Sequence, residues 1–412
     1  MALLTGAVAC RDASRAALPS VLPNDNTAAG GALHTDTLRL TLVARRAVWR
    51  PEADSGPSVE VVAFAEDGKA PQIPAPMIRV REGTVVDVTV RNTLADSTMN
   101  VIGLRSRPDP THDTLRVRPG ESQRVTFMAG APGTYLYAAV LGHHHPEVDE
   151  ERETLAGAFI IDPRDGSPPD RVLVLNIWGT LKDSVTYANA LAINGRSWPF
   201  TEHLAATVGD TLRWRVINAT IRPHPMHLHG FYFTVASRGD PYVDTSYTPD
   251  QRPTMVTERM PPGGSMLLTT VPDRPGNWLF HCHIAYHVVP EAAQLHAPDS
   301  THDETHSASA DEHMRGLILG INVASRRGDR AERRTGTRVM QLNVLEREPR
   351  ADKRRRMEYT LDDASAGAAW HAGGPMLVLQ QGQPTDITVV NHLQESTSVH
   401  WHGIELRSEE RR

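Results

Sequence analysis

The sequence predicts an all-β protein that consists of tandem Greek-key β-sandwiches. Thirty prolines and thirty glycines separate many short runs rich in Val, Thr and Leu, a pattern typical of strands joined by turns. A ten-residue segment occurs three times, and a second group of turn signals follows two of these copies at constant spacing. The 412 residues are also enough for several domains, each with its own hydrophobic core.

The recurring segment begins with a glycine and ends with an asparagine nine residues later. Apolar residues occupy alternate positions between them, which indicates a turn followed by a half-buried strand. The three copies are Gly83–Asn92 (GTVVDVTVRN), Gly209–Asn218 (GDTLRWRVIN) and Gly382–Asn391 (GQPTDITVVN).

A second module follows the first two copies. In each, a Pro-Gly turn lies thirteen residues before a glycine that opens an apolar strand: Gly120 precedes Gly133 (GTYLY), and Gly263 precedes Gly276 (GNWLF). We expect an apolar closing strand at 155–161 in the first repeat and at 317–323 in the second. These spacings favour Greek-key sandwiches.

We therefore predict three domains, at residues 35–165, 166–325 and 335–412. The third repeat contains only the first module, so we expect residues 335–412 to form an incomplete domain. Residues 1–34 are expected to be a signal segment or a disordered N-terminus.

Composition and the N-terminus bear on the location of the protein. Small and apolar residues precede Cys10, as at the end of a bacterial lipoprotein signal, although a basic segment is missing. We expect export to the periplasm or the cell exterior, with Cys10 as a lipid anchor; the alternative is an ordinary disordered N-terminus. No run of eighteen apolar residues predicts a membrane span, and the net charge of −6 argues against a nucleic-acid partner.

Three segments carry histidines at the spacing of metal ligands. They are His224–Gly230 (HPMHLHG), His281–His287 (HCHIAYH) and His400–Gly403 (HWHG). Residues i and i+2 of a strand face the same way, so each His-x-His pair presents two imidazoles to one side. Cys282, between two histidines, must then face the opposite side. One short strand can therefore serve a thiolate site on one face and an imidazole site on the other.

The residue types indicate copper. One cysteine with two histidines is the ligand set of blue-copper centres, in which any axial ligand is weak. Structural zinc sites use four ligands, commonly with a CxxC pair, and this sequence has no CxxC. A structural disulfide is not expected, because the only other cysteine is Cys10.

On these motifs the chain resembles the bacterial three-domain multicopper oxidases, which are related to laccases. HPMHLHG and HCHIAYH resemble the two C-terminal copper motifs of that family, and HWHG resembles its first N-terminal motif. The resemblance implies tandem cupredoxin-like domains. It implies a type 1 copper on His224, Cys282 and His287, and a type 2 copper on His227 and His400. It also implies a type 3 copper pair, with the ligands His229, His281, His283 and His402.

The reaction implied by the resemblance is the one-electron oxidation of a small reductant coupled to reduction of O2 to water. The reductant would be a phenol, an aromatic amine or a low-valent metal ion. Cys282 and its neighbours His281 and His283 would be the catalytic residues, because they connect the two copper sites. A monomer fits this reading, and a trimer is the alternative.

Two departures from the family pattern modify these expectations. The first repeat has Ala138-Ala139-Val140 where the second has His281-Cys282-His283, so we expect residues 35–165 to have lost their copper ligands and to be structural. The family's cluster uses four His-x-His pairs, and only three occur at matching positions here. We therefore expect O2 reduction to be impaired in this chain.

Two alternative functions remain. A copper nitrite reductase also combines type 1 and type 2 centres in cupredoxin repeats, but it does not need histidines on both sides of the type 1 cysteine. The second alternative is a copper-binding or electron-transfer protein without an oxidase reaction, which the incomplete third repeat favours.

Overall fold

The computed structural model shows a protein built almost entirely from β-strands, which confirms the predicted fold class. Two short 3-10 turns are present, η1 (Pro249–Gln251) and η2 (Ala285–His287), and no helix among the described residues is long and apolar enough to cross a membrane. The structure describes residues 17–112, 114–142, 154–181, 187–288, 314–326, 336–347, 356–363, 374–394, 397 and 399–404.

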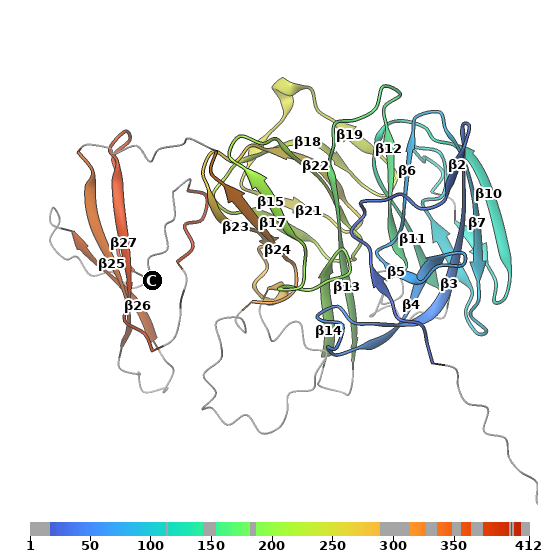
Figure 1. Cartoon of the computed structure of the whole chain (residues 1–412), viewed down its shortest axis with the longest axis horizontal. Helices are drawn as coiled ribbons and strands as arrows, with labels where there is room; N and C mark the ends of the chain where they lie inside the picture. The colour runs from blue at the N-terminus through green and yellow to red at the C-terminus, as the bar shows by residue number, and fades with distance from the viewer. Residues whose placement is uncertain are drawn as a thin grey trace, which may run out of the picture.

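A first sandwich packs a seven-stranded sheet against a five-stranded sheet (Figure 1). The larger sheet has the order β1-β5-β4-β3-β7-β10, with β2 paired to β3. Its strands are β1 (Leu22–Pro23), β2 (Ala32–His34), β3 (Thr37–Trp49), β4 (Val59–Glu66), β5 (Pro71–Ile73), β7 (Val85–Asn92) and β10 (Ser122–Met128). The smaller sheet, in the order β6-β12-β11-β8-β9, consists of β6 (Ala75–Arg81), β8 (Met99–Ile102), β9 (Leu115–Val117), β11 (Gly133–Leu141) and β12 (Ala156–Asp162).

A second sandwich has the same division into seven and five strands. The larger sheet, in the order β14-β13-β16-β22-β18-β19 with β20 beside β18, consists of β13 (Arg171–Leu181), β14 (Tyr187–Ile193), β16 (Leu212–Asn218), β18 (Phe233–Gly239), β19 (Asp244–Ser246), β20 (Thr254–Met255) and β22 (Ser265–Thr270). The smaller sheet, in the order β15-β24-β23-β17-β21, consists of β15 (His203–Thr207), β17 (His224–Leu228), β21 (Thr257–Met260), β23 (Gly276–Cys282) and β24 (Ile318–Ala324).

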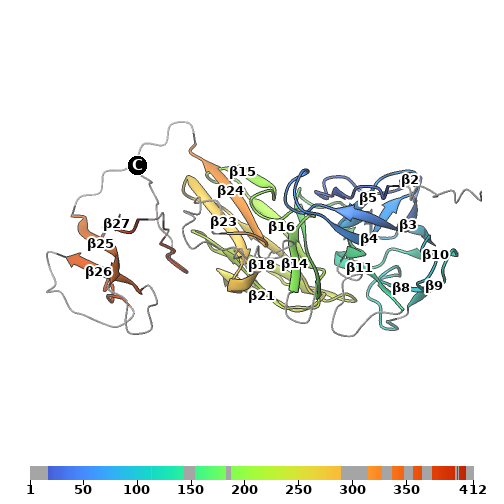
Figure 2. The same cartoon turned by 90° about the horizontal axis from the view of Figure 1, so that it is seen from below.

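A three-stranded sheet in the order β26-β25-β27 follows and lies at the far end of the row formed by the two sandwiches (Figures 1 and 2). Its strands are β25 (Arg338–Arg347), β26 (Arg356–Asp363) and β27 (Thr385–Asn391). Beyond β27, residues 399–404 approach β17 of the second sandwich, where they contribute to the site described below.

The recurring segment of the sequence forms equivalent strands in all three places. β7, β16 and β27 each pair in parallel with an earlier long strand of their own sheet, namely β3, β13 and β25. The glycine that begins each copy has a positive φ near 84°, which explains why glycine is required there: Gly83 86°, Gly209 84°, Gly382 82°. The asparagine that ends each copy accepts a hydrogen bond through Oδ1 from the backbone N–H two residues later.

Residues 17–34 differ from the expectation of a signal or disordered segment. β1 pairs with β5 and β2 pairs with β3 in the first sandwich. Asn24 and Asn26 are buried, and the amide of Asn26 donates to Oδ1 of Asn194 in the second sandwich at 3.0 Å. These strands are too short to show a period, so their order depends on partners far away in the sequence. The predicted lipid anchor, Cys10, lies outside the described residues.

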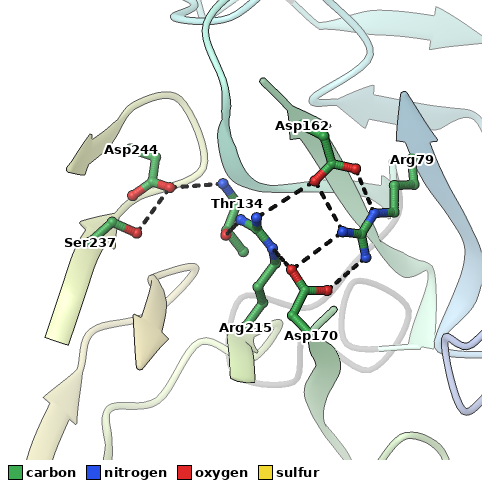
Figure 3. Close-up of polar contacts among 7 residues, drawn as sticks. All are labelled: Arg79, Thr134, Asp162, Asp170, Arg215, Ser237 and Asp244. Carbon is green, nitrogen blue, oxygen red and sulfur yellow. Dashed lines mark hydrogen bonds and ion pairs between the residues drawn. The ribbon is translucent and has the colours of Figure 1, made fainter. Parts of the chain in front are cut away.

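A buried set of charges joins the two sandwiches (Figure 3). Asp170 accepts hydrogen bonds from Arg79 of β6 and from Nε of Arg215 of β16, each at 2.7 Å. Arg79 also donates to Asp162, and Arg215 donates to Oγ1 of Thr134 in β11. Burial raises the pKa of Asp170, but the hydrogen bonds and charges of the two arginines hold it below its ordinary value. Apolar residues of β11 and β12 pack beside this network against β13 and β16.

We expect Asp170→Asn to lower the free energy of unfolding by about 3 kcal/mol, because removing one partner leaves buried charges uncompensated. Denaturant unfolding followed by circular dichroism measures this change. The matched control is Asp54→Asn, which removes an exposed partner of Arg196 and should leave the unfolding midpoint unchanged. Equal effects of the two substitutions would show that the buried network does not stabilise the interface.

Candidate metal centre

Two antiparallel strands of the second sandwich organise the centre. The register of β17 and β23 places Met226 opposite Cys282 and His227 opposite His281. Because side chains alternate along a strand, Met226 and Cys282 point into the hydrophobic core of this sandwich. His227 and His281 point to the other face. The predicted separation of the thiol from its flanking imidazoles is therefore present in the structure.

A thiol and two imidazoles meet inside the core. The Sγ atom of Cys282 lies 3.5 Å from Nδ1 of His224 and 3.4 Å from Nδ1 of His287. The short helix η2 turns the chain so that His287 returns toward the cysteine. All three side chains are at most 1% exposed, so this site is shielded from water.

The distances and protonation states of this group fit a copper ion. The separations of 3.5 and 3.4 Å between the sulfur and the two nitrogens suit donor atoms that would share one metal ion. Burial lowers the pKa of His224 to about 3 and that of His287 to about 4, and nearby positive charge adds to the effect. Both imidazoles are therefore neutral and can offer lone pairs. Burial raises the pKa of Cys282 to about 12 in the metal-free protein, so metal binding must displace its proton.

Six further imidazoles gather on the opposite face of β17 and β23. Nε2 of His229 lies 2.8 Å from Nε2 of His281. The ring centroids of His227 and His402 are 4.3 Å apart, and those of His229 and His400 are 4.0 Å apart. His283 joins the group through His402, at 4.7 Å between centroids. The ligand atoms of two subsets lie close enough to hold a metal ion: His227, His229 and His281, and His227, His400 and His402.

Backbone carbonyls determine which nitrogen of two of these rings faces the cluster. Nδ1 of His227 lies 2.7 Å from the carbonyl oxygen of Val256, and Nδ1 of His281 lies 2.8 Å from that of Cys282. A carbonyl only accepts, so both rings carry their proton on Nδ1 and keep a lone pair on Nε2. Nε2 of His227 is buried without a hydrogen-bond partner among the described residues, which suits a nitrogen that binds a metal ion.

Burial also favours the uncharged form of four cluster imidazoles. It lowers the pKa of His227 to about 3, that of His229 to about 2 and that of His281 to about 4, and the neighbouring rings reinforce the shift. The pKa of His400 is lowered for the same reasons. A set of neutral imidazoles in close contact is the donor set expected of a copper cluster.

The segment at 399–404 reaches the cluster from outside the second sandwich. The hydroxyl of Tyr232 donates to the carbonyl of Gly403 at 3.3 Å, and Gly403 and Ile404 lie against Leu228 and Phe231. Gly403 has a φ of 71°, close to the 74° of Gly230, the glycine that ends the matching HLHG motif of β17. The structure thus brings together all six predicted cluster histidines, and places His224, Cys282 and His287 in a separate site.

The first sandwich lacks this chemistry at the corresponding place. In β8 and β11, Val101 lies opposite Ala139, as Met226 lies opposite Cys282. Ala139 and Val101 belong to the hydrophobic core of that sandwich. Sequence reasoning missed two groups that orient the ligands, Thr220 and the carbonyl of Val256, because neither belongs to a metal-binding motif.

The lowered histidine pKa values predict an acid-sensitive metal-free protein. In the unfolded chain His224 and His287 titrate near 6.5, whereas in the folded chain they stay neutral to about pH 4 or below. The unfolded state thus takes up protons first, so stability is complete above about pH 6.5 and declines as the pH falls toward 4. Each ring should remove about 2 kcal/mol between pH 7 and pH 5.

Urea unfolding of the metal-free protein at pH 7 and pH 5 measures this slope. The double variant His224→Asn/His287→Asn should lose the share of these two rings and keep that of His227, His229 and His281, whose pKa values are also lowered. His34→Asn, which alters an exposed histidine of β2, should retain the whole slope. Equal stability of the wild-type chain at the two pH values would contradict the prediction.

Comparison with known proteins identifies the family. One model described as a multicopper oxidase matches residues 167–294, and a second with the same description matches 65–166 and 356–411; together they cover more than half of the chain. This chain belongs to the multicopper oxidase family. Membership implies copper as the metal, in agreement with the donor atoms of both sites.

Individual relatives share only part of their length with this multicopper oxidase chain. A probable nitrite reductase-hydroxylamine oxidoreductase fusion protein of Kuenenia stuttgartiensis is 28% identical over 253 residues, which cover 54% of this chain and 27% of that protein. Laccase-1 of Melanocarpus albomyces is 45% identical over 80 residues, 16% of this chain and 13% of the laccase. The chain therefore spans about a quarter or less of the length of the curated relatives it matches.

Solved structures agree with the fold. The multicopper oxidase mgLAC superposes with a TM-score of 0.52 at 20% identity, over 71% of this chain and 87% of that one. The predicted tandem cupredoxin-like sandwiches are thus confirmed.

Proposed function

We propose that this chain is a laccase-like oxidoreductase, which takes single electrons from a small reductant at a type 1 copper and delivers them to O2 at a second copper cluster. His224, Cys282 and His287 would hold the type 1 copper. His227 and His400 would hold the type 2 copper, and a type 3 pair would be bound by His229, His281, His283 and His402. Copper supplies reversible one-electron chemistry and the site at which O2 is reduced.

The observation that carries the proposal is the position of Cys282 between the two groups of ligands. Its thiol faces the buried site, whereas His281 and His283 on either side face the six-imidazole cluster. The carbonyl of Cys282 also accepts the Nδ1 proton of His281, which adds a hydrogen-bonded link to the covalent one. The chain therefore provides a path of only a few bonds between the sites.

The reductants we propose are phenols, aromatic amines or low-valent metal ions, because each can lose one electron at a time. Protein with copper restored should consume O2 when such a reductant is added, and an oxygen electrode measures this. We expect slow uptake, because the described residues supply three His-x-His pairs to the cluster, whereas the cluster of the family uses four. No O2 uptake above that of the metal-free chain would remove the oxidase proposal.

Nitrite reduction is the second candidate, because the Kuenenia stuttgartiensis relative is described as a probable nitrite reductase fusion protein. The cluster argues against it, since a nitrite reductase needs no imidazole on both sides of the type 1 cysteine. The same protein, supplied with a reductant and nitrite under argon, should form no nitric oxide. Nitric oxide without O2 uptake would reverse the assignment, and copper binding without either reaction would indicate an electron-transfer protein.

We further propose three cupredoxin repeats at residues 35–165, 166–325 and 335–412, of which the first is structural. The parallel pairing of β7, β16 and β27 with β3, β13 and β25 supports this division. We also propose export to the periplasm or the cell exterior, on the pattern of residues before Cys10. Detection of the protein in a periplasmic fraction of the native host tests the location.

A further inference from the structure

Thr220 contacts a ligand of the buried site from the loop between β16 and β17. It is fully buried, and its Oγ1 lies 2.9 Å from Nε2 of His224. The same hydroxyl has two contacts with the backbone of Arg222: Oγ1 lies 3.2 Å from the carbonyl oxygen and 3.1 Å from the amide nitrogen.

The three contacts determine the proton positions. A hydroxyl has one hydrogen to donate and two lone pairs that accept. All three contacts are satisfied together only when Thr220 donates to the carbonyl of Arg222 and accepts from the amide of Arg222 and from Nε2 of His224. His224 then carries its proton on Nε2. Its Nδ1, 3.5 Å from the sulfur of Cys282, keeps the lone pair that a metal requires.

A comparison within the chain sets Thr220 apart. The asparagines at the ends of β7, β16 and β27 accept hydrogen bonds, at 3.0–3.1 Å, from the residue two positions later. That residue is Leu94 in the first sandwich and Leu393 beside the three-stranded sheet. Only the sandwich that holds the thiol and two imidazoles has a hydroxyl there. An apolar side chain thus suits this backbone position in the other two copies, so the turn after the asparagine does not itself require a hydroxyl. In Thr220 the hydroxyl contacts both the backbone of Arg222 and the ring of His224.

We infer that Thr220 is a positioning residue that fixes the tautomer and ring orientation of His224 for binding copper through Nδ1. The inference rests on the proposed type 1 site. Without the hydroxyl, the proton of His224 can occupy Nδ1, where metal binding must displace it, and the ring loses the contact that holds its plane.

Two substitutions separate positioning from packing. Thr220→Val has nearly the same shape but cannot accept a hydrogen bond from Nε2 of His224. It should weaken copper binding about 10–100-fold, the usual effect of losing such a supporting group. It should also alter the thiolate-to-copper absorption band and the copper hyperfine splitting. Thr220→Ser retains the hydroxyl, so both spectra of this variant should match those of the wild-type protein. The control Thr154→Val removes a buried hydroxyl that bonds Val62 in the first sandwich, and it should leave copper binding unchanged.

The tautomer can also be measured without any variant. Nitrogen-15 NMR of the histidine rings in the wild-type, metal-free protein should show a proton on Nε2 of His224. A proton on Nδ1, or a Thr220→Val protein with wild-type copper affinity and spectra, would overturn the inference. If instead the wild-type chain shows no thiolate-to-copper band, the proposed type 1 site itself fails, and the tautomer result still stands on its own.

Discussion

Cys282→Ser is expected to abolish the intense blue absorption of the copper-loaded protein and leave the fold intact. The band arises because a thiolate transfers charge to Cu(II), and a serine oxygen is a far weaker donor. Cys282 is also the only cysteine among the described residues. Optical and electron paramagnetic resonance spectra of copper-loaded protein measure the loss, and far-ultraviolet circular dichroism tests the fold.

The matched control is Cys10→Ser, which removes the only other cysteine of the sequence. It should leave the band at full intensity, because no part of the proposed site depends on residue 10. A Cys282→Ser protein that remains blue would refute the assignment of this thiol to the type 1 copper.

His227→Ala is expected to remove copper from the imidazole cluster while the blue band persists. His227 belongs to both subsets of cluster ligands, so its loss weakens each of them. Loss of supporting groups alone weakens metal sites about 10–100-fold, so removal of a ligand should exceed that range. Elemental analysis after competition with a chelator should show the blue copper alone, and residual O2 uptake should disappear.

His203→Ala is the control for this experiment. His203 lies in β15, its ring stacks on Trp198, and it takes no part in the cluster. It should retain the copper content and O2 uptake of the wild-type chain. Loss of the blue band in His227→Ala would contradict the account, because it would mean that the two sites are not separate.

Local patterns in the sequence predicted much of the fold and the placement of the site residues. The period-2 segments at 83–92, 209–218 and 382–391 contain β7, β16 and β27. The same alternation predicted that Cys282 faces away from His281 and His283, since this follows from strand geometry alone. Which imidazoles combine into one site depends on the register of β17 and β23, which no local pattern contains.

Features that depend on distant partners were not predictable from the sequence. The strands at 22–34 are too short for a period, and β1 is ordered through its pairing with β5. The network around Asp170 joins Arg79 and Arg215, which are far apart in the sequence. Thr220 looks like an ordinary loop residue until its contact with His224 is seen. Only the comparison with Leu94 and Leu393 offered a signal in the sequence.

The central claim is that one strand serves two copper sites on its opposite faces. A crystal of the copper-loaded chain, measured on both sides of the copper absorption edge, tests it most directly through an anomalous difference map. We expect one peak between Sγ of Cys282 and Nδ1 of His224 and of His287, and separate density among His227, His229, His281 and the histidines of 399–404. A map without a peak beside Cys282, or with copper only at histidines outside these motifs, would contradict the account.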